Sequence, residues 1–327
     1  MGRLSSVESF ARSAARGFDV IQVEGLSKVF GRTVAVDDVT FTVQPGRVTG
    51  FLGPNGAGKS TTMRMVVGLD RPTAGRVLVD GAVYAGCRAP LRVVGALLEA
   101  KAFHPGRTAR QHLLGVARTH GIGRRRVEQV LELTGLAPVA DKRVGGFSLG
   151  MGQRLGIATA LLGDPGTLVL DEPVNGLDPE GVIWVRHLVR HLAGEGRTVF
   201  LSSHLMSEMG QTADHLLVIG RGRILADAPI DEVVAAAGGQ VVRARTRRPA
   251  ELSAVLQRRG LQVVTGEADE LEVTGASAEQ VAEAAAAAGI VLRELTTVGA
   301  SLEQAYLALT SGDVEYQFDP ELDGSVR

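Results

Sequence analysis

The first two thirds of the chain alternate between short apolar runs and longer segments whose apolar residues follow a helical spacing. Val39, Phe41 and Val43 occupy every second position, a pattern typical of a strand with one buried face. Residues 48–52 and 167–170 are continuously apolar, which indicates strands buried on both faces. Further strands are expected at residues 20–23, 76–79, 198–202, 216–219 and 223–225, and helices at 60–68, 148–162 and 179–192. This alternation predicts an α/β fold with a mainly parallel sheet.

A segment from about residue 99 to residue 160 has a different, mostly helical pattern. Helices are expected at residues 109–118 and 125–133, and Val127, Val130 and Leu131 share one face of the second helix. The segment therefore predicts a helical subdomain within the α/β domain. The basic run at residues 124–126 is expected to be the solvated start of a helix.

The pattern changes again after residue 236, where small residues indicate a linker. The segments that follow are strand, helix, strand, strand, helix and strand, at residues 241–246, 249–259, 262–265, 270–274, 277–288 and 290–295. This order resembles a small α+β ferredoxin-like fold, and a last helix is expected at residues 301–310. The predicted organisation is a disordered tail (1–18), an α/β domain (19–236), an accessory α+β domain (237–311) and a second tail (312–327).

Composition excludes several classes of protein. The chain has 327 residues, 45% of them hydrophobic and 22% charged, with a formal net charge of −1, so no basic excess favours a nucleic-acid partner. No apolar run reaches the roughly 18 residues that a membrane-spanning helix needs. The first residues lack the apolar core of a secretory signal. The only cysteine, Cys87, allows no internal disulfide, which favours a reducing compartment.

A glycine-rich loop follows the apolar run at residues 48–52. It fits the pattern G-x-x-x-x-G-K-[ST], in which backbone N–H groups and a helix N-terminus face bound phosphates. We expect Lys59 to contact the β- and γ-phosphates of a nucleotide and the Ser60 hydroxyl to bind Mg²⁺. The predicted nucleotide-binding residues are Gly53, Pro54, Asn55, Gly56, Ala57, Gly58, Lys59, Ser60 and Thr61.

Two adjacent carboxylates end the apolar run at residues 167–170. Asp171 is expected to hold the metal ion, and Glu172 to act as general base on the attacking water. Two acidic residues at the end of a strand can also be ordinary solvated side chains. Their combination with the phosphate loop favours the catalytic interpretation.

With these motifs and three more, residues 19–227 resemble the ABC ATPase family. Asn175-Gly176-Leu177-Asp178-Pro179 is similar to the family's D-loop, and Ser202-Ser203-His204 to its switch segment. Phe147-Ser148-Leu149-Gly150-Met151, followed by Gln153-Arg154, takes the place of the signature normally written LSGGQ. Leu149 and Met151 depart from that consensus, whereas Ser148 and Gly150 match it. The resemblance implies that Ser148 and Gly150 contact the nucleotide held by a second, head-to-tail copy of the chain.

The same resemblance implies roles for three more residues. Phe30 stacks on adenine, His204 contacts the γ-phosphate and takes part in catalysis with Lys59 and Glu172, and Glu99 helps to place the metal. Glu99 stands where the family usually has glutamine. Each residue also has a plainer interpretation: a core phenylalanine, a structural histidine and a surface glutamate.

The resemblance implies that the chain binds and hydrolyses ATP·Mg²⁺ to power a membrane exporter of a drug, antibiotic or lipid-like compound. Glu99 and the altered signature favour the drug- and antibiotic-exporting branch. The implied partners are a membrane-spanning permease and a second copy, on the cytoplasmic face of the membrane. Two alternatives stay open: a soluble ABC ATPase without a transport role, and a catalytically weak regulatory module.

Overall fold

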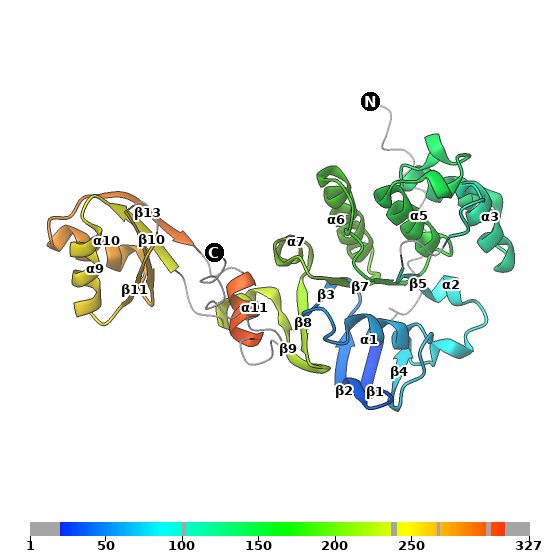
Figure 1. Ribbon diagram of the computed structural model, residues 1–327, viewed down its shortest axis with the longest axis horizontal. Helices are drawn as coiled ribbons and strands as arrows, with labels where there is room; N and C mark the ends of the chain where they lie inside the picture. The colour runs from blue at the N-terminus through cyan, green and yellow to red at the C-terminus, as the bar shows by residue number, and fades with distance from the viewer. Residues whose placement is uncertain (1–19, 100–102, 237–240, 267–268, 299–301, 311–327) are drawn as a thin grey trace, which may run out of the picture. The chain divides into compact units, whose positions relative to one another are not determined.

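The computed structural model describes residues 20–99, 103–236, 241–266, 269–298 and 302–310 (Figure 1). The two expected tails, and part of the linker, lie outside these residues. The chain divides into two compact units between Asp227 and Ala228. This division comes earlier than the boundary expected after residue 236, because helix α8 (Ile230–Ala236) packs against α11 (Leu302–Thr310) of the second unit.

A six-stranded sheet forms the centre of the first unit, in the order β5-β6-β7-β3-β8-β9. The pairs from β5 to β8 are parallel, as the sequence predicts. The strands are β3 (Val48–Leu52), β5 (Val94–Leu97), β6 (Thr167–Leu170), β7 (Thr198–Ser203), β8 (His215–Gly220) and β9 (Arg223–Pro229). Every residue of β3, β6, β7 and β8 is buried, because helices or a second sheet cover both faces.

Strand β5 was not predicted from the sequence. It contains Gly95, where an added β-carbon would lie 2.1 Å from the backbone oxygen of Ala160 on helix α5 (Leu149–Leu161). Only glycine allows the strand and the helix to approach so closely. A strand of four residues interrupted by glycine has too little alternation to be recognised locally.

A second, antiparallel sheet of order β2-β1-β4 covers one side of the central sheet. Its strands are β1 (Ile21–Phe30), β2 (Thr33–Val43) and β4 (Ala74–Val79). The core between the sheets contains three aromatic rings, those of Phe41, Phe51 and Phe200, with centroids 5.2, 5.7 and 6.0 Å apart. Helix α1 (Lys59–Val66) lies on this side, whereas α6 (Pro179–Gly194) and α7 (Met206–Thr212) lie on the other (Figure 1).

The helical segment consists of α3 (Ala109–Thr119) and α4 (Arg124–Leu133), which pack against each other and against α5. Val127, Val130 and Leu131 are fully buried, as the helical spacing predicts. A short helix α2 (Pro90–Val93) precedes β5, and 3₁₀ turns occur in the connecting loops at Tyr84–Gly86, Ala137–Val139 and Val144–Gly146.

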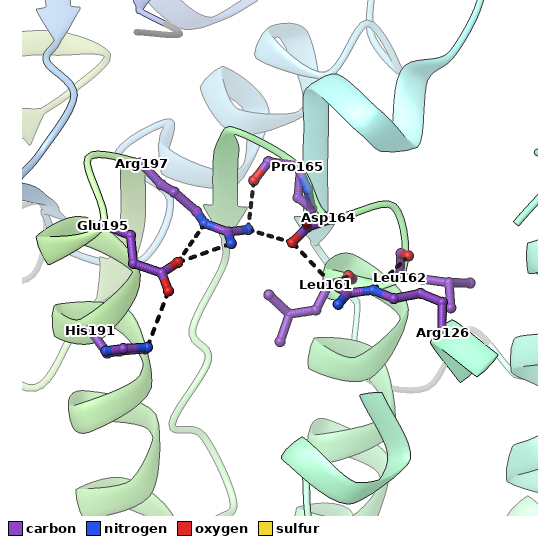
Figure 2. Close-up of polar contacts among 8 residues, drawn as sticks. All are labelled: Arg126, Leu161, Leu162, Asp164, Pro165, His191, Glu195 and Arg197. Carbon is purple, nitrogen blue, oxygen red and sulfur yellow. Dashed lines mark hydrogen bonds and ion pairs between the residues drawn. The ribbon is translucent and has the colours of Figure 1, made fainter. Parts of the chain in front are cut away.

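A network of charged groups connects the helical segment to the central sheet (Figure 2). Arg126 of α4 donates to the Leu161 carbonyl at 2.7 Å and to the Asp164 carboxylate at 3.2 Å. Arg197, just before β7, donates to the same Asp164 oxygen at 3.0 Å and pairs with Glu195. The expectation of a solvated basic run is therefore wrong for Arg126, whose side chain is only 17% exposed.

The second unit contains an antiparallel sheet of order β11-β12-β10-β13, with the connectivity of a ferredoxin-like fold. Helices α9 (Pro249–Arg258) and α10 (Ala278–Ala287) supply apolar side chains to its core. The strands are β10 (Val241–Thr246), β11 (Gln262–Thr265), β12 (Glu270–Thr274) and β13 (Leu292–Val298). Among the helices described in either unit, none combines the length and apolar character that crossing a membrane requires.

Candidate functional site

The glycine-rich loop connects the buried strand β3 to helix α1. At Gly58, φ is +107°, and an added β-carbon would lie 2.5 Å from the backbone oxygen of Ala35 on β2. At Gly53 the same atom would lie 2.4 Å from the backbone oxygen of Ile219 on β8. The loop therefore packs against two strand backbones. Asn55, Gly56 and Ser60 remain exposed at its outer side.

Lys59 is curled into this loop, with only 7% of its surface exposed. Its Nζ donates to the carbonyl oxygens of Gly53 at 2.5 Å and Pro54 at 3.0 Å. Burial lowers the pKa of Lys59, and the nearby carboxylates of Glu172 and Asp171 act against this shift. The structure therefore brings the lysine of the first motif and the two acids of the second into one electrostatic group.

Asp171 lies directly after β6, and its N–H donates to the carbonyl of Leu97 at the end of β5 at 2.7 Å. The hydroxyl of Ser202, at the end of β7, donates a short hydrogen bond to Asp171 Oδ1. The same Ser202 oxygen accepts the N–H of Glu172 at 2.9 Å. Ser202 is fully buried, so one hydroxyl aligns both acids without competition from water.

Glu172 has a backbone φ of +49°, a left-handed conformation that costs a non-glycine residue about 1–2 kcal/mol. Its carbonyl accepts a hydrogen bond from Gln153 Nε2 at 2.8 Å, and its carboxylate lies 2.8 Å from His204 Nδ1. Such strained backbone is typical of functional sites when its surroundings hold it in place. The site residues predicted from the sequence did not include Gln153 or Ser202. Both lie in motifs that could have pointed to them: Gln153 follows the signature segment, and Ser202 begins the switch segment.

Ser148 and Gly150 lie at the N-terminus of α5. Ser148 caps the helix, because its Oγ accepts the N–H of Met151 at 3.2 Å. A β-carbon added to Gly176 would lie 2.1 Å from Leu149 Cδ2, so the Leu149 side chain packs directly on the loop that follows Glu172. The two departures from the signature consensus therefore preserve the helix cap and add an apolar contact to that loop.

Phe30 and Glu99 lie apart from these direct contacts. Phe30 ends β1 with half of its surface exposed, and Lys28 Nζ lies 4.9 Å from its ring centroid, so it is not a core residue. Glu99 is exposed after β5. The pKa of Arg64 on α1 is raised mainly by its hydrogen bond to Asp70 and, to a smaller extent, by Glu99, which therefore lies near the helix that carries Ser60.

The donor atoms at the site suit a magnesium ion that is shared with phosphate oxygens. Among the described residues there is no group of three metal-ligating side chains. Mg²⁺ requires none, because it usually keeps several waters and binds one or two protein oxygens beside a nucleotide. The Asp171 carboxylate, and the exposed Ser60 hydroxyl at the N-terminus of α1, are oxygen donors of this kind.

Comparisons with known proteins agree with this arrangement. Residues 36–175 match the family described as ABC transporter. Residues 240–303 match a domain of unknown function, and residues 142–210 match an AAA domain.

Two relatives and one solved structure illustrate the likeness. The bacitracin transport ATP-binding protein BcrA of Bacillus licheniformis is 43% identical over 217 residues, which are 65% of this chain and 71% of that protein. The daunorubicin resistance ATP-binding protein DrrA3 of Streptomyces coeruleorubidus is 35% identical over 305 residues, 90% of this chain and 96% of that protein. The dimeric structure of a bacterial ABC transporter cassette matches with a TM-score of 0.59 and 21% identity, over 64% of this chain and 98% of that one. That structure supports the fold, and the two relatives establish the family. The chain belongs to the ABC transporter family, as an ATP-binding and ATP-hydrolysing protein.

Proposed function

We propose that the chain is the motor subunit of an exporter and that it uses the residues described above to hydrolyse ATP. The observation that carries this proposal is the single group formed by Lys59, Asp171 and Glu172. In that group Lys59 is buried, the charges of both carboxylates act against the lowering of its pKa, and the Glu172 carboxylate contacts His204. A cation, a metal-binding acid and a base are the parts that phosphoryl transfer requires.

In this proposal the loop amides from Gly53 to Thr61 and the N-terminus of α1 bind the phosphates. Lys59 leaves the carbonyls of Gly53 and Pro54 and turns to the β- and γ-phosphates. Ser60 and Asp171, with Glu99 nearby, would hold Mg²⁺, which supplies positive charge to the phosphate oxygens. Glu172 accepts the proton of the attacking water, and His204 stabilises the charge at the γ-phosphate.

The second copy and the membrane partner are also part of the proposal. Ser148 and Gly150 lie at an exposed helix N-terminus that suits a phosphate, and we assign them to the nucleotide held by the opposite copy. Phe30 is half exposed, which suits stacking on adenine. A membrane-spanning permease is the partner on which ATP binding and hydrolysis act, and the chain would bind it at the cytoplasmic face of the membrane.

The cargo proposed is a drug, an antibiotic or a lipid-like compound. This assignment rests on the functions named for the relatives, bacitracin transport and daunorubicin resistance. The accessory unit, residues 237–311, is proposed to support dimerisation or regulation.

The test measures phosphate release by the purified chain with ATP and Mg²⁺. The Glu172→Gln variant keeps the shape of the side chain but removes the base, and we expect it to bind ATP and lose about a hundredfold or more in rate. Lys59→Ala should lose ATP binding as well. The result that would contradict the proposal is a Lys59→Ala protein that binds and splits ATP like the parent. Equal rates near zero for the parent and Glu172→Gln would instead favour a regulatory module.

A further inference from the structure

The backbone of Glu172 is held on both sides by buried side chains from other elements. Its N–H donates to Ser202 Oγ on β7 at 2.9 Å, and its carbonyl accepts from Gln153 Nε2 on α5 at 2.8 Å. Gln153 is 2% exposed and Ser202 is fully buried. Water cannot easily replace these bonds, so they fix the two peptide planes around Glu172.

These bonds matter because Glu172 belongs to no helix or strand. The strand β6 ends at Leu170, and α6 begins at Pro179. With a φ of +49°, Glu172 is also in a backbone conformation that residues other than glycine rarely adopt. The direction of its side chain therefore depends on neighbours that hold the peptide, and Gln153 is the neighbour on the carbonyl side.

Ser202 and Gln153 differ in what else they do. Ser202 also binds Asp171, so a change there affects the proposed metal-binding acid as well as Glu172. Gln153 Nε2 donates to the Glu172 carbonyl and lies on the helix that begins at Leu149, after the cap residue Ser148. A substitution of Gln153 therefore tests the positioning of Glu172 while the hydrogen bond between Ser202 and Asp171 is kept.

We propose that Gln153 is a positioning residue for ATP hydrolysis. Its amide holds the peptide that follows Glu172 and so aims the Glu172 carboxylate at His204 and at the attacking water. This inference rests on the proposed function of Glu172 as general base. It adds a buried residue that acts through Glu172 rather than on the nucleotide itself.

The same helix contacts the chain after Glu172 at a second point. Leu149, in the first turn of α5, packs on Gly176, and a β-carbon added to Gly150 would lie 3.3 Å from the Gly176 backbone oxygen. Helix α5 therefore holds both Glu172 and the loop beyond it.

The test compares Gln153→Met and Gln153→Leu, which leave an apolar side chain in the buried site but remove the N–H donor. The matched control is Arg154→Met, because Arg154 also donates from α5 to a backbone carbonyl, that of Thr134 at 3.1 Å, away from Glu172. The full-length chain is assayed for phosphate release over a range of ATP concentrations. ATP affinity and the melting temperature are measured on the same preparations.

We expect both Gln153 variants to lose about ten- to hundredfold in kcat, with the ATP affinity unchanged. Arg154→Met is expected to keep its kcat even if its melting temperature falls. The inference is overturned if either Gln153 variant keeps the parental kcat, or if Arg154→Met loses as much. An inactive parent would overturn the proposed function itself, whereas an active parent with unaffected Gln153 variants overturns this inference alone.

Discussion

At the scale of single residues, the site depends on backbone conformations that ordinary side chains avoid. Glu172 adopts one of them and is held there by Ser202 and Gln153. Gly58 adopts another, at a φ of +107°, directly beside the backbone oxygen of Ala35. Glycine adopts such a conformation without strain, so Gly58 allows the close approach to β2, whereas the strained backbone of Glu172 is of the kind found at functional sites.

Gly58→Ala is expected to be the more damaging of two loop substitutions. Its β-carbon would lie 2.5 Å from the Ala35 oxygen, which must move, whereas Gly56, at a φ of +82°, has no atom within 4 Å of the same position. We expect Gly58→Ala to lower the free energy of unfolding by about 2 kcal/mol or more and Gly56→Ala by about 1 kcal/mol. Urea denaturation of both variants measures the difference. Equal losses would show that the close approach to β2 is unimportant.

At the scale of elements, helices were predicted from the helical spacing of apolar residues, and three of the described helices in the first unit also carry a side-chain N-cap. Thr108 caps α3 in a reciprocal arrangement with Gln111, and Ser148 and Asp178 cap α5 and α6. Each cap lies next to the helix that it begins, so it adds a local signal to the apolar spacing. The strand β5 has no comparable signal, and its glycine is explained only by contact with α5.

Thr108→Ala should weaken the start of α3 without changing its buried face. The substitution removes the oxygen that accepts the N–H of Gln111 at 3.1 Å, and the loss of an N-cap typically costs about 1 kcal/mol. Thr108→Ser keeps the acceptor and serves as the control, with an expected change below about 0.5 kcal/mol. Chemical denaturation measures both values. A serine variant as unstable as the alanine variant would argue against the cap.

At the scale of the whole molecule, charged groups connect parts of the first unit that lie far apart in the sequence. Asp164 accepts hydrogen bonds from Arg126 of the helical segment and from Arg197, the residue just before β7 (Figure 2). The arginine side chains are only 17% and 11% exposed. Removing the shared carboxylate would leave two poorly solvated cations close together, so the network holds the helical segment against the sheet.

Asp164→Asn is expected to destabilise the first unit by about 1–2 kcal/mol, a value reduced from that of a fully buried pair because Asp164 itself is 41% exposed. Asparagine keeps the size of the side chain and tolerates the local φ of +54°, so the change removes mainly the charge. Asp37→Asn, which breaks an exposed pair with Arg223, is the control, with an expected loss below about 0.5 kcal/mol. Urea denaturation measures both losses. Similar values would show that the Asp164 network stabilises the protein no more than an exposed ion pair does.

The sequence by itself determined the motifs, most of the helices and strands and the family, because each of these depends on residues that are close together in the chain. The phosphate loop with Lys59 and the acids at 171–172 are local patterns whose chemistry follows from residue type and order. Only the tertiary structure decided that Gln153 and Ser202 hold Glu172, that Arg126 is buried against Asp164, and that β5 joins the sheet. Each of these is a contact between residues far apart in sequence, and no local pattern specifies which distant partner a buried polar group or a glycine will meet.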